Sequence, residues 1–294
     1  MYRKNLVSWV LLFLLLLSGC VKIPAPVDES HAATLSATVS ILPQRYFVER
    51  IGGAHVAVTV MVQPGESPAT YEPEPAQLVA LNAADLYFSI GVPFERAWLT
   101  KFAATNPEML VVDTAEGIER RPISRDATET SGENLDPHIW LSPALVKVQA
   151  QNIYRALVQL DPEREVEYQA NLDAFLADIE VLQAEIQATL QDSTGERFMV
   201  FHPSWGYFAD EFGLQQLPIE SGGQEPSAQE LAGIIATAQA EGIRVIFAQP
   251  EFSTKAAEMI AQEIGGKVQL ISPLALDWLA NMRRATIAFA ESSQ

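Results

Sequence analysis

Eight short apolar runs, four in each half of the chain, restrict the fold more than any other feature. Those of the first half are TLSATVSIL, VAVTVMV, DLYFSIG and MLVVDT, and those of the second half are RFMVF, LQQLPIE, IRVIFAQ and KVQLIS. Segments with helical periodicity, such as PAQLVALNAA and SAQELAGIIATAQAEG, separate them. Short apolar runs that alternate with helices predict buried strands in parallel sheets. The predicted fold class is therefore α/β, with two Rossmann-like lobes that each contain a mainly parallel four-stranded sheet.

The stretch between the two halves predicts a rigid connection. Ser142 and Pro143 are suited to the N-cap and the first position of a helix. From Pro162 to about Leu190, apolar residues recur at three- and four-residue steps, with no glycine or further proline. This second stretch is long enough for a single helix of roughly 40 Å. We expect an N-terminal lobe over residues 34–160, a backbone linker helix over 161–192 and a C-terminal lobe over 193–294.

The N-terminus has the features of a secretory signal. Two basic residues precede an apolar run over residues 11–17, and two small residues precede Cys20, the only cysteine of the chain. This boundary resembles the lipobox of bacterial lipoproteins, in which the cysteine becomes the lipidated first residue. We expect a signal peptide over residues 1–19, a lipid on Cys20 and a tether over residues 20–33. The alternative is an uncleaved anchor with an incidental cysteine.

The expected location is the cell envelope outside the cytoplasm, either periplasmic or on the outer face of the cytoplasmic membrane. Acyl chains would hold the protein on the membrane. The net charge is −18, and removal of residues 1–19, which contain two basic and no acidic residues, brings it to −20. A chain this acidic repels phosphate backbones, so nucleic acid is not an expected partner. Because lipid would consume the sole thiol, the folded part has neither a disulfide nor a thiolate metal site.

Three side chains with metal-binding chemistry lie near the ends of predicted strands. His202 follows the run RFMVF, His138 lies between two prolines in LDPHIWLSP, and Asp277 lies in SPLALDW after the last strand. Ligands of open α/β sheets bind beyond the carboxyl ends of the strands. Neutral imidazoles and a carboxylate are common zinc ligands, although these spacings match no compact zinc motif. A cation site is one interpretation, and core or capping histidines with a surface carboxylate are the other.

Six motifs then occur in an order that points to a known family. They are PGESPATYEPEPAQLVALNAADLYFSIG, DPHIWLSP, FHPSWGYFADEFGL, EPSAQEL, IFAQPEFSTKAAEMIAQEIGGKV and SPLALDW. Together they resemble the zinc- and manganese-binding lipoproteins that serve bacterial ABC importers, over nearly the whole chain from about Ser36. The resemblance implies two α/β lobes joined by a rigid helix, a metal in the cleft between them, and delivery to a membrane permease by a monomer. His138 and His202 fall on metal histidines of the family, and Asp277 falls on the carboxylate of the second lobe.

One ligand of that family is missing here. The family turn reads PG-x-x-P-H-x-[YF]-E-P, and its histidine is replaced by Ala69 in PGESPATYEP. The prolines, the glycine, Tyr71 and Glu72 of the turn are present, so three candidate ligands remain instead of four. Water, or a carboxylate oxygen of Glu66 or Glu72, is a candidate for the open position, and Tyr71 is a further candidate for the cleft. The segment 119–136 also lacks the histidines that zinc-specific members often carry there.

Three interpretations from different classes follow. The favoured one is a lipid-anchored binding protein that captures zinc, with Mn²⁺ or Fe²⁺ as alternative ions, because all three accept nitrogen and oxygen ligands. The second is a family member that has lost the first metal ligand and binds another small ligand or a metal chelate. The third is a zinc hydrolase, since three protein ligands and a water also compose a catalytic site. An enzyme is not expected, because G-x-S-x-G, HExxH and P-loop signatures are absent from the sequence.

Overall fold

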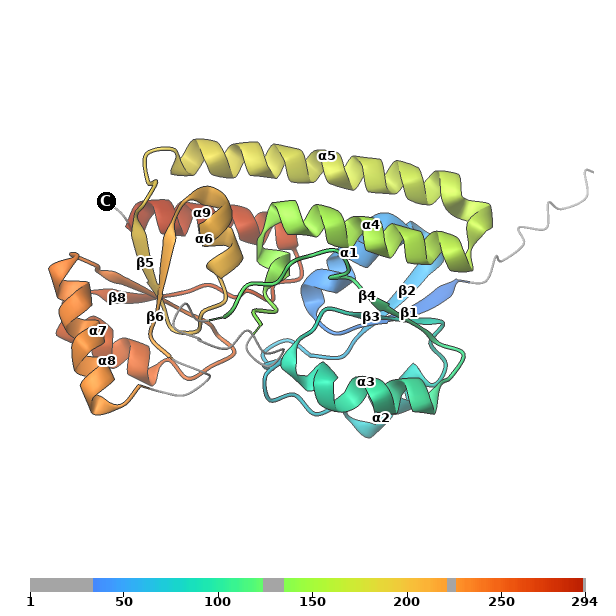
Figure 1. Ribbon diagram of the computed structural model, residues 1–294, viewed down its shortest axis with the longest axis horizontal. Helices are drawn as coiled ribbons and strands as arrows, with labels where there is room; N and C mark the ends of the chain where they lie inside the picture. Colours follow the sequence, from blue (N-terminus) through green and yellow to red (C-terminus); the bar gives the residue numbers. More distant parts are fainter. Residues whose placement is uncertain (1–33, 124–134, 221–225, 293–294) are drawn as a thin grey trace, which may run out of the picture. The chain divides into compact units, whose positions relative to one another are not determined.

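The computed structural model describes residues 34–123, 135–220 and 226–292, which contain two parallel four-stranded sheets (Figure 1). The first sheet has the order β2-β1-β3-β4 and the second the order β6-β5-β7-β8, and all neighbouring strands pair in parallel. The strands are β1 (Leu35–Val39), β2 (Val56–Val60), β3 (Leu86–Ser89), β4 (Leu110–Asp113), β5 (Arg197–Val200), β6 (Gln215–Pro218), β7 (Val245–Ala248) and β8 (Lys267–Leu270). The predicted α/β class with two parallel sheets is confirmed.

The helices cover both faces of each sheet. Those of the first half are α1 (Leu42–Gly52), α2 (Pro75–Leu81) and α3 (Pro93–Thr105), and those of the second half are α6 (Gly206–Phe212), α7 (Ala228–Ala240), α8 (Lys255–Glu263) and α9 (Trp278–Ser292). Short 3₁₀ helices span Gly53–His55, Ile139–Leu141 and Pro162–Arg164. Every residue of the interior strands β3 and β7 is buried, as expected for parallel strands with helices on both sides.

Two helices connect the halves. They are α4 (Pro143–Leu160) and the 26-residue α5 (Glu165–Leu190), which packs against α1, α4 and α9 (Figure 1). Helix α4 begins as its sequence predicts, because the Ser142 hydroxyl accepts a hydrogen bond from the backbone N–H of Leu145 at 3.2 Å. The 26 residues of α5 correspond to a length of about 39 Å.

One hydrophobic core joins the two sheets. A continuous cluster of buried side chains includes Phe88 of β3, Phe175 of α5 and Phe247 of β7. A second cluster fills the space between the second sheet and helices α7 and α8. Indole hydrogen bonds strengthen the junction: Trp278 Nε1 donates to the carbonyl of Trp140 at 2.7 Å, and Trp140 Nε1 donates to the carbonyl of Pro273 at 2.8 Å. The two halves are therefore bound by shared packing as well as by the connecting helices.

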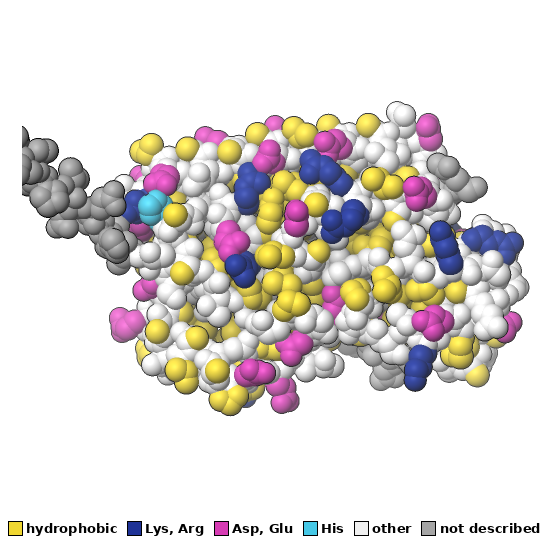
Figure 2. Space-filling model, turned by 180° about the vertical axis from the view of Figure 1, so that it is seen from behind, with side chains coloured by type: hydrophobic (Ala, Val, Ile, Leu, Met, Phe, Trp, Pro, Cys, Tyr) yellow, Lys and Arg dark blue, Asp and Glu magenta, His cyan; other side chains and the backbone are white. Residues whose placement is uncertain are grey.

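On the face opposite to that of Figure 1, acidic and basic side chains are interspersed with apolar ones (Figure 2). No helix among the described residues combines the length and apolarity needed to cross a membrane. The predicted signal peptide, Cys20 and the tether lie outside the described residues.

Candidate metal centre

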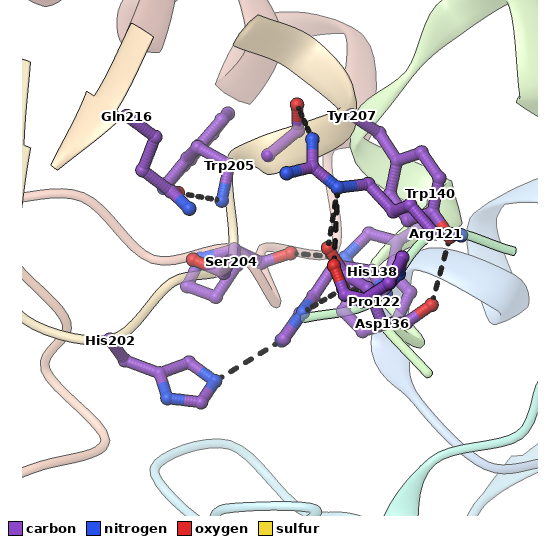
Figure 3. A network of polar contacts seen from close by, with 12 residues as sticks. Arg121, Pro122, Asp136, His138, Trp140, His202, Ser204, Trp205, Tyr207 and Gln216 are labelled. Carbon is purple, nitrogen blue, oxygen red and sulfur yellow. Dashed lines mark hydrogen bonds and ion pairs between the residues drawn. The ribbon is translucent and has the colours of Figure 1, made fainter. Parts of the chain in front are cut away.

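Two histidines from different halves of the chain face each other (Figure 3). His138 immediately precedes the 3₁₀ turn that leads into α4, and His202 follows strand β5. Their Nε2 atoms are 3.3 Å apart, and their rings are inclined at 70° with centroids 5.1 Å apart. His138 is buried, with 7% of its surface exposed, and His202 is partly buried. The fold thus brings together two residues that are 64 positions apart in sequence.

A buried carboxylate binds the other nitrogen of each ring. Asp136 Oδ1 lies 2.7 Å from His138 Nδ1, and a Glu220 carboxylate oxygen forms a short contact with His202 Nδ1. Asp136 and Glu220 are themselves 0% and 7% exposed. Because an ionised carboxylate only accepts hydrogen bonds, Nδ1 is the donor in each of these contacts, which leaves Nε2 as the nitrogen available to a metal ion. This pairing of carboxylate and imidazole is the usual way in which proteins orient histidine ligands of metals.

The distance between the two Nε2 atoms suits a shared cation. The two Nε2 atoms lie 3.3 Å apart, and which of them donates in this contact depends on the tautomers of the rings. Two nitrogen ligands of a tetrahedral zinc ion, each about 2.0–2.1 Å from the metal, are themselves separated by about 3.3–3.4 Å. A cation between the rings would therefore need little displacement of either one.

Burial keeps His138 ready for ligation. It lowers the pKa of His138 below the usual 6.5, against the opposing effect of the Asp136 carboxylate. The imidazole is consequently neutral at pH 7, and a metal ion does not have to displace a proton from it.

Asp136 is held by contacts that cross between the halves (Figure 3). The Tyr207 hydroxyl donates to the backbone carbonyl of Asp136 at 3.0 Å, and it accepts from the backbone N–H of Arg121 at 3.0 Å. The Arg121 side chain donates to the carbonyl of Gly206 at 2.7 Å and pairs with Asp210, and its Nε lies 3.9 Å from Asp136 Oδ2. Burial raises the pKa of Tyr207 to about 12, so its hydroxyl remains a donor at pH 7. These contacts anchor the carboxylate that orients His138.

Both histidines line a cavity of about 850 Å³ whose wall comes from both halves of the chain. Ala69 and Arg96 contribute from the first half, and Glu251 and Phe252 from the second. The Phe252 ring lies 5.4 Å from the His202 ring, measured between centroids. The cavity is far larger than one metal ion, so it has room for solvent or for a small molecule beside the histidines.

Of the four turn residues singled out in the sequence, one lines this cavity and three do not. Ala69 lies in the cavity wall. Glu66 and Glu72 are exposed, and Glu66 Oε2 instead accepts from the backbone N–H of Gln63 at 3.0 Å. Tyr71 is buried against Phe94 with a ring separation of 5.1 Å. The turn thus brings residue 69, which is exposed, to the border of the cavity, whereas the two exposed glutamates do not line it.

Asp277 is not brought to the histidines. It is exposed at the start of α9, where its Oδ1 accepts from the backbone N–H of Ala280 at 3.1 Å, and it does not line the cavity. Within residues 34–123, 135–220 and 226–292, no three histidine, cysteine, aspartate or glutamate side chains are arranged to hold a metal ion together. The predicted ligand role of Asp277 therefore finds no support in its position.

Sequence reasoning missed Asp136 and Glu220, the two carboxylates that bind the histidine rings. Asp136 had a usable signal, because an acidic residue two positions before a loop histidine in DPH is well placed to bind that histidine. Glu220 had none, since it lies 18 positions after His202 and only the pairing of β5 with β6 brings it near that ring.

The fold and the buried histidine pair define the class: a two-lobed α/β protein with a candidate metal centre between its halves. Residues 38–292 match the family described as zinc-uptake complex component A, periplasmic. The chain belongs to this family of zinc-uptake binding proteins.

Relatives support this assignment at the level of sequence and structure. The high-affinity zinc uptake system protein ZnuA of Bacillus subtilis is 28% identical over 257 residues, which cover 84% of this chain and 80% of that protein. A crystal structure of ZnuA is 46% identical, has a TM-score of 0.84 and matches 89% of this chain and 100% of its own. The laminin-binding protein Lmb of Streptococcus agalactiae, an adhesin with metal-transporting activity, is 26% identical with a TM-score of 0.78, over 89% of this chain and 100% of its own. These relatives are binding proteins of transport systems and not enzymes, which excludes the hydrolase interpretation.

Proposed function

We propose that this chain is a lipid-anchored, extracytoplasmic binding protein that captures zinc between His138 and His202 and delivers it to the permease of an ABC importer. The observation that supports this most is the pair of Nε2 atoms 3.3 Å apart, each on a ring whose Nδ1 is bound by a buried carboxylate. Family membership supports import of zinc. The sequence at Cys20 supports the lipid anchor, and we propose that the protein acts as a monomer.

The donor set favours zinc over the alternative ions. Imidazole nitrogen suits zinc well, whereas Mn²⁺ prefers carboxylate, carbonyl and water oxygens. Fe²⁺ also accepts imidazole, so competition between ions in one assay decides among the three. We expect zinc to displace both Mn²⁺ and Fe²⁺ at equal concentrations. Sites of this kind generally bind Fe²⁺ more tightly than Mn²⁺, and Zn²⁺ more tightly than either.

Capture follows from the charges around the site. The two imidazoles replace water in the hydration shell of the ion, and the buried carboxylates of Asp136 and Glu220 offset its charge through the rings. The shared core and the connecting helix α5 oppose a wide hinge. Metal exchange therefore involves loop and side-chain movement more than closure of whole lobes.

The cavity also favours a second candidate ligand, a metal chelate. Its volume of about 850 Å³ and the small side chain of Ala69 leave space beside the histidines for an organic molecule that carries the ion. Native mass spectrometry after loading separates the two candidates, because the bound mass is that of one zinc ion in the first case and of zinc plus a small molecule in the second.

The central experiment is zinc titration of single histidine variants in competition with a chromophoric chelator. His138→Ala and His202→Ala should each lower zinc affinity at least about tenfold, because each removes a direct ligand. His55→Ala is the matched control: His55 lies outside the cavity and binds Glu167 at 2.9 Å, so its loss should leave zinc affinity unchanged. Equal zinc binding by all three variants and the parent protein would disprove the proposed site.

A further inference from the structure

Among the described residues, three glutamates line the histidine cavity, and two of them are already engaged. Glu220 binds His202 Nδ1. Glu230 is exposed and completes the capping box of α7, where its Oε2 accepts from the backbone N–H of Ser227 at 2.8 Å. Glu251 accepts a hydrogen bond from the Ser272 hydroxyl through Oε1 only. Its Oε2 is buried and has no hydrogen-bond partner among the described residues.

Glu251 lies at the same edge of the second sheet as His202 for a topological reason. It lies in the turn after β7, and β7 pairs in parallel with β5, the strand that ends just before His202. The carboxyl ends of parallel strands meet at one edge of a sheet, so Glu251 and His202 share that edge. The next residue, Phe252, packs its ring against the ring of His202. Ser272 follows β8, the neighbouring strand on the other side of β7.

We propose that Glu251 is the third protein ligand of the captured ion, an inference that rests on the proposed zinc site at His138 and His202. A buried carboxylate oxygen without a donor is unfavourable, and a divalent cation beside it removes that penalty. Carboxylate oxygen is an ordinary zinc ligand and completes a set of two imidazoles and one carboxylate.

The side chain reaches the ion by turning. No three candidate ligands are arranged around one point in the described part of the chain, so Glu251 is not yet in a ligating position. When the ion enters between the imidazoles, the carboxylate turns from Ser272 toward it. The ligand from the second half of the chain then comes from the turn after β7, since Asp277 lies at the surface.

The test compares three variants in zinc titrations and in the visible spectrum of bound Co²⁺. Glu251→Gln should weaken zinc binding at least roughly tenfold, comparable to the loss of an outer-shell partner in other sites, and it should change the Co²⁺ spectrum. Glu230→Gln removes the same charge from the same cavity wall and should change neither. Ser272→Ala removes only the hydroxyl that holds Oε1, so zinc should bind with equal or higher affinity.

Three results would overturn the inference. One is zinc affinity and a Co²⁺ spectrum of Glu251→Gln equal to those of the parent protein. Another is a loss of zinc affinity in Glu230→Gln equal to that in Glu251→Gln, because the loss would then be a general effect of removing a negative charge. The last is equal weakening by Ser272→Ala, because the Glu251–Ser272 contact would then matter only structurally. The histidine variants keep the two proposals apart: loss of zinc binding in His138→Ala with no effect of Glu251→Gln contradicts the ligand role of Glu251 alone. Thermal melts without metal verify that each variant folds.

Discussion

Ala69 shows how a single side chain sets the number of ligands. It lies in the cavity wall, on a turn that four prolines within residues 63–75 constrain. The backbone therefore holds this position at the border of the histidine cavity whether or not the side chain can bind a metal. An imidazole placed here would enter the site with little additional ordering of the loop.

We expect Ala69→His to bind zinc more tightly than the parent protein. Since a ligand stabilises the folded state by RT ln(1 + [L]/Kd), the variant should also show a larger zinc-induced rise in melting temperature at equal free zinc. Thr70→His is the control, because Thr70 is exposed on the same turn and does not line the cavity. If Ala69→His binds zinc no better than Thr70→His, another group already occupies that coordination position or the cavity serves a different ligand.

At the scale of elements, Glu95 in the first turn of helix α3 makes the stability of the fold depend on pH. Its buried carboxylate accepts from the backbone N–H of Ile90 at 3.0 Å, from Gly91 and from the Ser40 hydroxyl. Despite these hydrogen bonds, burial raises the pKa of Glu95 from 4.5 to about 7. The folded state therefore holds a proton that the unfolded state loses above about pH 4.5. The contribution of this proton to stability is complete below pH 4.5 and is lost as the pH rises through 7.

Glu95→Gln should remove this dependence. The difference in unfolding free energy between variant and parent should shift in favour of the variant between pH 4.5 and pH 8, by up to about 3 kcal/mol. Urea unfolding of both proteins across this range measures the shift. A difference that stays constant with pH would mean that Glu95 titrates alike in the folded and unfolded states.

At the scale of the whole molecule, the shared core predicts cooperative unfolding. Buried residues of both sheets belong to one hydrophobic cluster, which also includes residues of α5 and α9, two helices that pack against each other. Separation of the halves would expose this common interior to water, so neither half is expected to unfold alone.

Calorimetry of the chain should accordingly show a single transition with equal calorimetric and van't Hoff enthalpies. Zinc should move this transition as a whole to higher temperature, because its ligands come from both halves. Two separate transitions, or a zinc-induced shift of only part of the heat absorption, would show that the predicted lobes over residues 34–160 and 193–294 are energetically independent.

Local patterns were enough to predict the elements. Each strand could be recognised from its short apolar run, and the start of α4 from the capping chemistry of Ser142, because these signals act over a few residues. The order of the motifs further indicated the family and the two histidines. His138 and His202 could be singled out because the carboxyl ends of parallel strands are where such sheets bind ligands.

Only the tertiary structure decided which side chains surround those histidines. Asp277 and Glu251 both follow strands of the second sheet, yet one caps a helix at the surface and the other lines the cavity. The pairing of Asp136 and Glu220 with the two rings and the 3.3 Å between the Nε2 atoms likewise appear only after folding. A sequence specifies that a carboxylate follows a strand. The direction in which that carboxylate points depends on the packing of segments far apart in the chain, and a metal site tolerates errors of only a fraction of an ångström.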